Sequence, residues 1–275
     1  MGNHPFTMHL RKNKFARASS GMGKEFVFRY SQRDCKVVIG SRNAEKLQQI
    51  AEQCMRQFPN STVVPVQTDV TKEDECQRLI DVAIERFGRI DILILNAGIS
   101  AHQKFEEVQD MKIFHQIMET NFYGYLYPTR YALPYLKKSH GQIVVMSSYS
   151  GEIGLHYRTA YCASKFAVTG FFESLRMELS DQIYITIICP ITVETSFREN
   201  SLIKPVGDDN HQMTYEETKK RGSSMAVEDA IDVILTAIDV KMRKIFFPTK
   251  AWFANYLRPI FPDIIDRKLY AMAKL

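Results

Sequence analysis

Short apolar runs alternate with longer segments of helical period along this chain from residue 36 onward. The runs with the length and β-branched composition of strands lie at residues 36–40, 63–67, 91–95, 143–146 and 183–188. Strands that are separated by helices pair in parallel, because a parallel pair needs a long crossover connection. The sequence therefore predicts an α/β protein with a doubly wound, mainly parallel sheet.

The segments between these runs carry helix signals. One helical face is shared by Leu47, Ile50, Ala51, Cys54 and Phe58. Thr71 and Asp74 resemble a capping box at the start of the next helix, and Gly88 is expected to close it. Further helices are predicted at residues 108–138, 161–179 and 226–240, with a last strand at residues 244–247.

Composition bounds the classes of function. A length of 275 residues fits one domain covering residues 1–275, and a net charge of +5 with interspersed acids argues against a nucleic-acid partner. The five cysteines have no paired spacing, which favours buried free thiols in a reducing compartment. No run of eighteen apolar residues is present, so the chain is expected to be cytoplasmic and not transmembrane, with association at the endoplasmic reticulum surface as an alternative.

Three residues near the middle of the chain have the pattern of a proton-transfer site. Tyr161 and Lys165 lie four residues apart on a predicted helix, and Ser148 follows the predicted strand at residues 143–146. Residues at this spacing share a helix face, so the ammonium is expected to lower the tyrosine pKa from about 10. The serine hydroxyl is expected to orient a carbonyl oxygen. Two other tyrosine and lysine pairs with this spacing, at positions 215/219 and 270/274, are interpreted as solvated helix faces.

A glycine-containing stretch at residues 18–24 opens a helix whose predicted buried face carries Met22, Phe26, Val27 and Tyr30. Glycines let a diphosphate approach the backbone N–H groups at a helix N-terminus, where the helix dipole also favours an anion. A dinucleotide site is therefore expected there.

Several motifs together resemble the short-chain dehydrogenase/reductase family. They are Ala18-Ser-Ser-Gly-Met-Gly23, Asn96-Ala-Gly98, Asn121, Ser148, Tyr161-x-x-x-Lys165 and the segment at residues 190–195. The similarity covers roughly residues 15 to 250 and is strongest to the hydroxysteroid-dehydrogenase-like branch. It implies an NAD(P)-dependent oxidoreductase with a single Rossmann-type domain.

The resemblance also implies roles for individual residues. Ser148 would fix the substrate oxygen, Tyr161 would act as acid and base, Lys165 would lower the tyrosine pKa and hold the nicotinamide ribose, and Asn121 would support a proton-relay water. An arginine after the second strand accommodates a 2′-phosphate, which favours NADP(H), although NAD(H) stays open. The expected cofactor contacts are Ser19, Ser20, Gly21, Met22, Gly23, Ser41, Arg42, Asp69, Val70, Asn96, Ala97, Gly98, Tyr161, Lys165, Pro190, Val193 and Thr195.

The start of the chain departs from the family pattern. An apolar strand followed by Thr-Gly is usual, but here Ala16 and Arg17 occupy the last two positions, after a basic segment. Unpaired buried charges cost several kcal/mol each, so residues 11–17 are not expected to form the first strand, which is predicted to be degenerate or missing. Either residues 6–10 form a shortened strand, or, as we favour, the first fifteen residues come from an alternative exon or an error in gene prediction. Smaller departures are Leu95 and Ile191.

Three functions follow from these patterns. The leading interpretation is an NADP(H)-dependent oxidoreductase that interconverts an alcohol and a carbonyl on a small apolar substrate such as a steroid, retinoid or other lipid. The alternative is a catalytically impaired relative or splice form that acts through protein association. The weakest is a membrane-binding module formed by the amphipathic tail at residues 249–275.

Three further expectations concern the tail, a substrate lid and metals. Packing of the tail over the substrate site, or against another subunit of a homo-oligomer, is favoured over membrane contact. The polar stretch at residues 196–224 is expected to be a substrate lid. The histidines lack metal-ligand spacing, so no metal is predicted.

Overall fold

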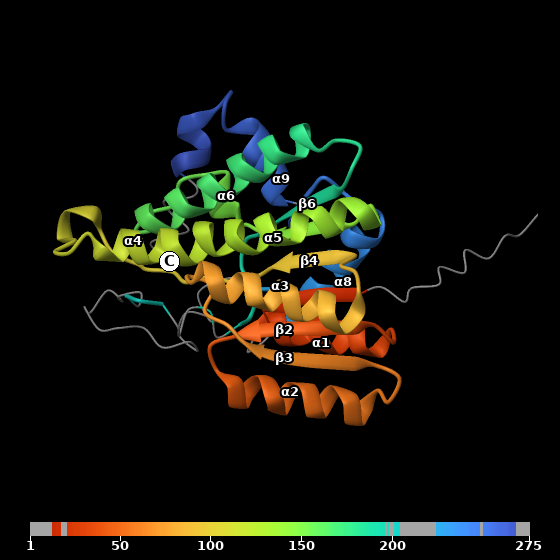
Figure 1. Ribbon diagram of the computed structural model, residues 1–275. Helices are drawn as coiled ribbons and strands as arrows, with labels where there is room; N and C mark the ends of the chain where they lie inside the picture. The colour runs from red at the N-terminus through yellow and green to blue at the C-terminus, as the bar shows by residue number, and fades with distance from the viewer. Residues whose placement is uncertain are drawn as a thin grey trace, which may run out of the picture.

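The protein is described by a computed structural model for residues 13–17, 21–195, 197, 201–203, 224–247 and 250–267. Within these residues, seven parallel strands form one sheet in the order β3-β2-β1-β4-β5-β6-β7. Figure 1 labels β3, β2, β4 and β6, which follow one another across the sheet in this order. The strands are β1 (Asn13–Arg17), β2 (Lys36–Ser41), β3 (Thr62–Gln67), β4 (Ile92–Leu95), β5 (Gln142–Met146), β6 (Tyr184–Pro190) and β7 (Lys244–Phe247). The predicted doubly wound α/β fold is confirmed.

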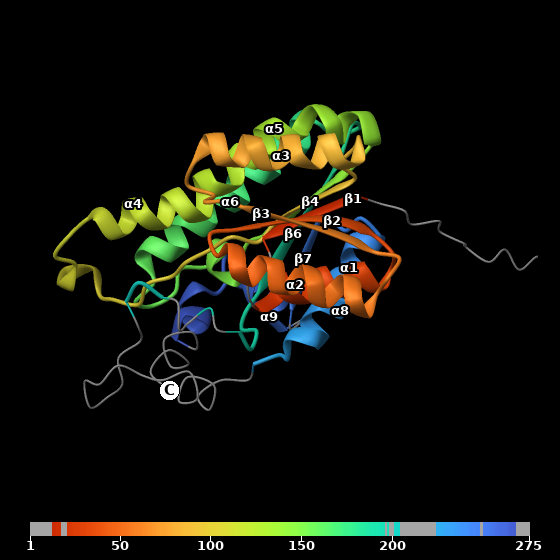
Figure 2. The same ribbon diagram turned by 60° about the horizontal axis from the view of Figure 1, so that its bottom comes forward.

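Helices cover both faces of the sheet (Figure 2). One face packs against α1 (Gly21–Gln32), α2 (Ala44–Gln57) and α8 (Val227–Asp239), and the other against α3 (Glu73–Phe87), α5 (Gly124–Ser139) and α6 (Thr159–Glu178). Successive side chains of a strand point to opposite faces of the sheet, so each strand contributes to both cores. In β4, Ile92 and Ile94 pack on the α1/α2/α8 side, and Leu93 and Leu95 pack on the α3/α5/α6 side. Such strands read as continuous apolar runs because both faces are buried.

Two helical segments differ in detail from expectation. The region predicted as one helix consists of α4 (Lys112–Met118), a π-helical turn (Glu119–Tyr123) and α5. The capping box predicted for α3 is wrong, because the helix begins after Lys72 and the Thr71 N–H and hydroxyl both donate to the Asp69 carboxylate, at 3.0 and 2.9 Å. Gly88 closes α3 in a left-handed conformation (φ 72°), as predicted.

The expectation that residues 11–17 cannot form the first strand is wrong. Asn13–Arg17 is the third strand of the sheet, paired over five positions with β2 and over three with β4. The main-chain hydrogen bonds of a ladder form whatever the side chains are, and both neighbours present complete strands to pair with. Residues 6–10, the proposed substitute strand, lie outside the described residues.

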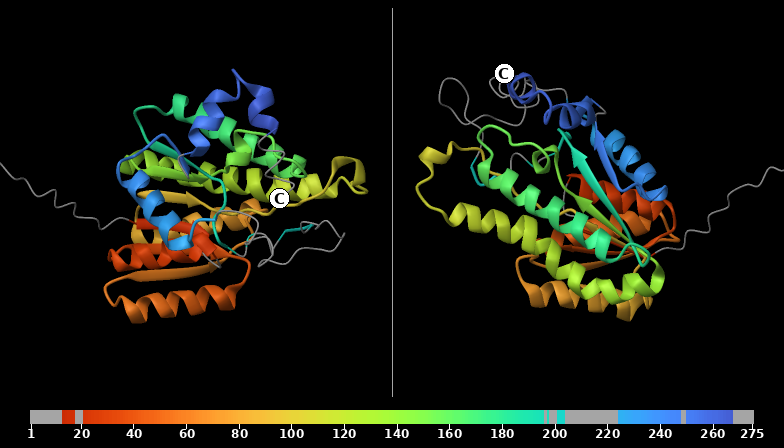
Figure 3. Two further views of the ribbon diagram at one scale, coloured as in Figure 1. Left: turned by 180° about the vertical axis from the view of Figure 1, so that it is seen from behind. Right: turned by 90° about the horizontal axis from the view of Figure 1, so that it is seen from above.

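The C-terminal part contains α9 (Lys250–Leu257), which lies beside the edge strand β7 (Figure 3), and a helical segment at residues 262–267. Exposed apolar side chains gather on this part, at Trp252, Phe253, Tyr256, Leu257, Ile260, Phe261 and Ile264. Within the described residues no helix combines the length and apolarity needed to cross a membrane. Most of the lid predicted at residues 196–224 lies outside the described residues.

All five cysteines are buried free thiols, as predicted. Cys35 and Cys54 belong to the α1/α2/α8 cluster, and Cys189 belongs to the opposite one. They therefore act as small apolar core residues in the fold.

The core on the α6 side yields a prediction about stability. Phe172 lies on the buried face of α6 and is 0% exposed, whereas Phe166 on the same helix is 45% exposed. Phe172→Ala should lower the free energy of unfolding by about 3–5 kcal/mol, and Phe166→Ala by less than about 1 kcal/mol, because only the first leaves a cavity. Urea denaturation of both variants checks this, and equal losses would contradict the described packing.

Candidate active site

A cavity of about 930 Å³ opens at the carboxyl ends of the strands. It lies where β1 and β4 are neighbours and the chain order reverses, the position at which open α/β sheets bind ligands. Loops after β2, β3, β4, β5 and β6 line it, together with the N-terminus of α1 and one face of α6. The described residues therefore form one continuous site of a size suited to a large ligand.

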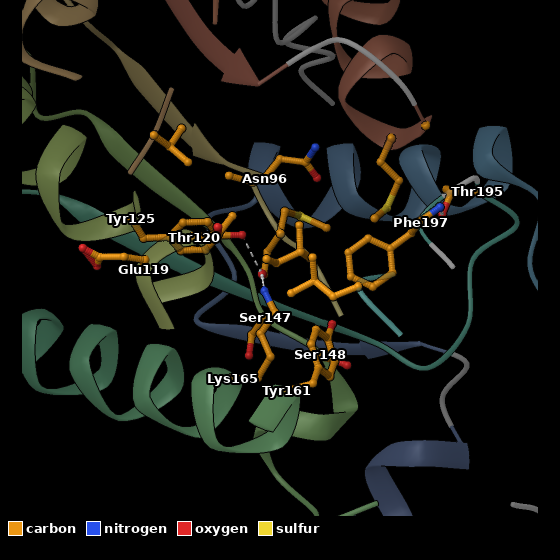
Figure 4. A pocket seen from close by; sticks show the side chains of 18 of the residues that line it. Asn96, Glu119, Thr120, Tyr125, Ser147, Ser148, Tyr161, Lys165, Thr195 and Phe197 are labelled. Atoms are coloured by element: carbon orange, nitrogen blue, oxygen red, sulfur yellow. Dashed lines mark hydrogen bonds between the residues drawn. The ribbon is translucent and has the colours of Figure 1, made fainter. Parts of the chain in front are cut away.

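Ser148, Tyr161 and Lys165 meet on one side of this cavity (Figure 4). Ser148 follows β5, and the other two project from α6. All three are buried, with exposed fractions of 6%, 5% and 3%. The predicted convergence of these three side chains is present in the structure.

Lys165 is desolvated and bonded to the main chain. Its Nζ donates to the Met146 carbonyl oxygen at 2.7 Å and lies 5.2 Å from the Tyr125 ring centre. Burial lowers the pKa of Lys165 to about 7, from an ordinary value of 10.5. Near neutral pH this side chain therefore exchanges readily between its charged and neutral forms.

Tyr161 differs from the expectation that its pKa would be lowered. Burial raises the pKa of Tyr161 above its ordinary value of 10, while the charge of Arg158 and a hydrogen bond with Ser148 oppose this rise. Lys165 lies 5.8 Å from the ring centre and is not among the groups that lower the pKa. Tyr161 is therefore a protonated phenol at neutral pH in this structure, the form that donates a proton.

Arg158 is a cavity residue that sequence analysis missed. Its guanidinium carbon lies 5.6 Å from the Tyr161 ring centre, and its Nε donates to His102 Nε2 at 2.8 Å. Burial lowers the pKa of Arg158, yet arginine stays charged in proteins. Arg158 precedes α6 with a non-helical backbone (φ −124°, ψ 29°), so helical spacing gave no signal for its position.

Asn121 lies behind the cavity, not on its wall. Its side-chain amide donates to the Ile99 carbonyl at 3.0 Å and to Ser164 Oγ at 2.9 Å, and its oxygen accepts from the Ile99 N–H at 2.8 Å. These bonds tie the loop after β4 to α6 through the π-helical turn. Its role in a proton relay stays a prediction.

The opposite end of the cavity has the donor set of a dinucleotide site. Gly21, at the N-terminus of α1, has a left-handed backbone (φ 53°), and a Cβ there would lie 3.1 Å from Thr195 Cγ2. Helix N-termini bind phosphate through their free N–H groups. Arg42 and Lys46 add positive charge beyond the end of β2. The residues present therefore fit a nicotinamide dinucleotide.

Most of the predicted contacts line this cavity. They are Gly21, Met22, Arg42, Asp69, Val70, Asn96, Ala97, Gly98, Ser148, Tyr161, Lys165, Pro190, Val193 and Thr195. Gly23 and Ser41 are not lining residues: Gly23 is buried inside α1, and Ser41 is buried with its hydroxyl directed at the Asn43 carbonyl (3.5 Å). Ser19 and Ser20 lie outside the described residues.

Other lining residues were not among the expected contacts, although Ile191 and Thr192 fall within the motif at residues 190–195. They are Asn43, Lys46, Thr68, Thr71, Ile99, His115, Gln116, Glu119, Thr120, Tyr125, Met146, Ser147, Arg158, Ile191, Thr192, Phe197 and Leu202. Many follow directly on a predicted strand, so their position at the carboxyl edge of the sheet was an available signal. Those on α4 and in the π-helical turn had none.

Comparison with known proteins identifies the family. The family model for short chain dehydrogenase matches residues 17–204. A dehydrogenase/reductase SDR family protein 7-like of Dictyostelium discoideum is 33% identical over 253 residues, which cover 90% of this chain and 77% of that protein. The chain belongs to the short chain dehydrogenase family, whose members are oxidoreductases that use NAD(P)(H).

Relatives in plants point to one branch of this family. An 11-beta-hydroxysteroid dehydrogenase A of Sesamum indicum is 40% identical over 182 residues, covering 66% of this chain and 52% of that protein. An 11-beta-hydroxysteroid dehydrogenase 1A of Arabidopsis thaliana is 37% identical over 191 residues, which cover 70% of this chain and 54% of that protein. The matches thus span about half the length of these plant relatives.

Solved structures agree on the fold. A short chain dehydrogenase/reductase of Burkholderia phymatum in complex with NAD superposes with a TM-score of 0.79, 21% identity and coverage of 92% and 94% of the two chains. An alcohol dehydrogenase of Thermococcus sibiricus complexed with 5-hydroxy-NADP superposes with a TM-score of 0.74 and 21% identity. The superposition covers 86% of this chain and 95% of that chain. At this identity, the likeness supports the fold alone.

The desolvated lysine yields a prediction about stability and pH. Between pH 7 and 10.5 the unfolded chain holds a proton on Lys165 that the folded chain lacks, so this group's contribution to the free energy of unfolding rises with pH. Lys165→Met removes that contribution. From pH 7 to 9, wild type should gain about 2 kcal/mol relative to the variant in urea titrations. Lys112→Met, whose side chain is 82% exposed, is the control. A difference between wild type and Lys165→Met that stays constant with pH would contradict the lowered pKa.

Proposed function

We propose that this chain is an NADP(H)-dependent oxidoreductase that interconverts an alcohol and a carbonyl on an apolar substrate, with Tyr161 as the general acid and base. The observation that carries the proposal is the convergence of Ser148, Tyr161 and Lys165 in a cavity whose other end has the donor set of a dinucleotide site. Proton transfer and cofactor binding would thus occur in one continuous site.

The chemistry follows from the forms of the side chains. A bound nicotinamide dinucleotide supplies or accepts the hydride. The Tyr161 phenol donates its proton to the carbonyl oxygen during reduction and takes it back during oxidation, with Ser148 holding the same oxygen. Lys165, with a pKa near 7, can give a proton to the phenolate that reduction leaves behind. A buried site favours this transfer because water does not compete for these groups.

The cofactor preference rests on Arg42. It follows β2 and lines the cavity, where an arginine can pair with the 2′-phosphate of NADP(H). Lys46 on the first turns of α2 adds a second positive charge nearby. Carboxylates that would select NAD(H) are absent from the three residues after Gly40, which are Ser41, Arg42 and Asn43.

The substrate class rests on apolar side chains beside Tyr161. Phe197 has its ring centre 5.9 Å from that of Tyr161, and Ile99 and Leu202 also line the cavity. The plant relatives are named as hydroxysteroid dehydrogenases, which agrees with a large apolar substrate. We extend this class to the present chain as a proposal.

The second interpretation, a non-catalytic relative that acts through protein association, is less well supported. It rested on the loss of the first strand and of the first glycine of the cofactor loop. Asn13–Arg17 pairs on both of its sides, so the strand is present, and only the replacement of the glycine by Arg17 still favours this interpretation. The relatives are also named as dehydrogenases. A cofactor titration separates the two interpretations, since the non-catalytic relative would not bind NADPH.

Tyr161→Phe should abolish most of the turnover. The variant keeps the ring but lacks the proton donor, so kcat should fall about 10²–10⁴-fold while the Kd for NADPH changes little. Steady-state kinetics of NADPH-dependent ketone reduction and a fluorescence titration give the two values. Tyr184→Phe, at the start of β6, is the matched control and should behave as wild type. Retained turnover in Tyr161→Phe would refute the assigned role.

Arg42→Leu should reduce the affinity for NADPH and not for NADH. Loss of a charge-assisted contact of about 1.5–3 kcal/mol corresponds to a rise of about 10- to 100-fold in the Kd for NADPH. Nicotinamide fluorescence measures both cofactors, and Arg56→Leu, exposed on α2, is the charge-matched control. Tighter binding of NADH than NADPH by wild type would overturn the preference. No binding of either at millimolar concentration would overturn the proposed function.

A further inference from the structure

Arg158 is a half-buried cation in the substrate end of the cavity. Among the residues that the structure describes, no aspartate or glutamate forms an ion pair with it, and the charges that act on its pKa are those of Tyr161 and Cys162. By contrast, the half-buried Lys244 is paired with Glu152 at 2.9 Å. Arg158 therefore carries a desolvation cost that no carboxylate in the described part of the chain offsets.

Among the described residues, one hydrogen bond holds the guanidinium, at its Nε edge. Its Nε donates to His102 Nε2, which accepts because arginine has no acceptor atom. His102 is itself fixed by its main chain, whose N–H donates to the Ile203 carbonyl at 3.1 Å, and the next residue donates to the Tyr157 carbonyl at 2.9 Å. The two terminal nitrogens have no hydrogen bond to a described residue, and the side chain lines the cavity. These nitrogens form the fork that binds a carboxylate with two parallel hydrogen bonds.

We propose that Arg158 binds a carboxylate of the substrate, so that the preferred substrates are apolar oxo acids and hydroxy acids. The guanidinium carbon lies 5.6 Å from the centre of the ring that bears the reactive hydroxyl. A substrate whose carbonyl reaches Tyr161 and Ser148 would therefore place an acid group, about one ring's width away, against the free fork. This inference rests on the proposed function and specifies the substrate class of the same site.

A different role for Arg158 makes a different prediction. Its charge lowers the pKa of Tyr161, and if it did no more, its loss would change turnover of charged and neutral ketones by the same factor. Binding of a carboxylate instead makes the acid and its neutral ester respond differently. The ratio of the acid's binding and turnover to those of its ester therefore separates the two roles of Arg158: binding of a carboxylate, and an effect on the pKa of Tyr161.

The test uses matched ligands: 3-acetylbenzoate and 4-acetylbenzoate, each with its methyl ester. Calorimetry gives the Kd of each for the full chain, and NADPH oxidation gives kcat/KM. Wild type should bind at least one acid about tenfold or more tightly than its ester, because the charge-assisted pair contributes about 1.5–3 kcal/mol. Arg158→Leu and Arg158→Gln should bring this ratio close to one. Arg130→Leu removes an exposed arginine and should keep the wild-type ratio.

Each outcome decides the proposal. If wild type binds acid and ester equally well, or binds neither acid, the proposal is overturned by the wild-type data alone. A preference that persists in Arg158→Leu or Arg158→Gln also overturns it. If the preference depends on Arg158 but no ketone is reduced, the anion site stands and the proposed function fails. If esters and acids are reduced equally well and bound equally well, the proposed function stands and the anion site fails.

Discussion

The pairing of β1 with β2 on one side and β4 on the other holds the two halves of the sheet together. Every element of the candidate site depends on it, because the reversal of chain order at β1 and β4 opens the crevice in which the site lies. Main-chain hydrogen bonds supply this pairing, so a segment with polar residues can occupy the central position. The helices α1 and α6 then deliver the two ends of the cavity to the same edge.

Burial shifts the pKa values of three neighbouring groups in different directions: Tyr161 and Lys165 on α6, and Arg158, which precedes this helix. It holds Tyr161 in its protonated form and lowers the pKa of Lys165 to about 7. Both side chains can therefore be uncharged near neutral pH. Arg158 is half-buried beside them but keeps its charge at any ordinary pH. The fixed cation of the site is therefore the arginine, and the lysine is the group whose charge changes. This division suits proton transfer at one position and recognition at another.

The sequence predicted what depends on periodicity and spacing. The strands from residue 36 onward, Gly88 as a helix end, and the meeting of Ser148 with Tyr161 and Lys165 all follow from local patterns. The first strand was misjudged because side-chain charge was weighed without the pairing that two complete neighbours provide. The direction of the Tyr161 pKa shift depends on how much water the fold excludes. The lack of a carboxylate partner for Arg158 among the described residues depends on which side chains surround it. Neither can be predicted from the spacing of residues in the sequence.

The segment after β6 couples the two ends of the cavity. Thr195 lies so close to Gly21 that a Cβ there would sit 3.1 Å away, and Phe197 lies against Gly98, where a Cβ would approach its ring to 3.4 Å. The same phenyl ring stands 5.9 Å from that of Tyr161. Thr195 and Phe197 thus lie against the N-terminus of α1, the loop after β4 and the ring of Tyr161, so both ends of the cavity share this part of its wall.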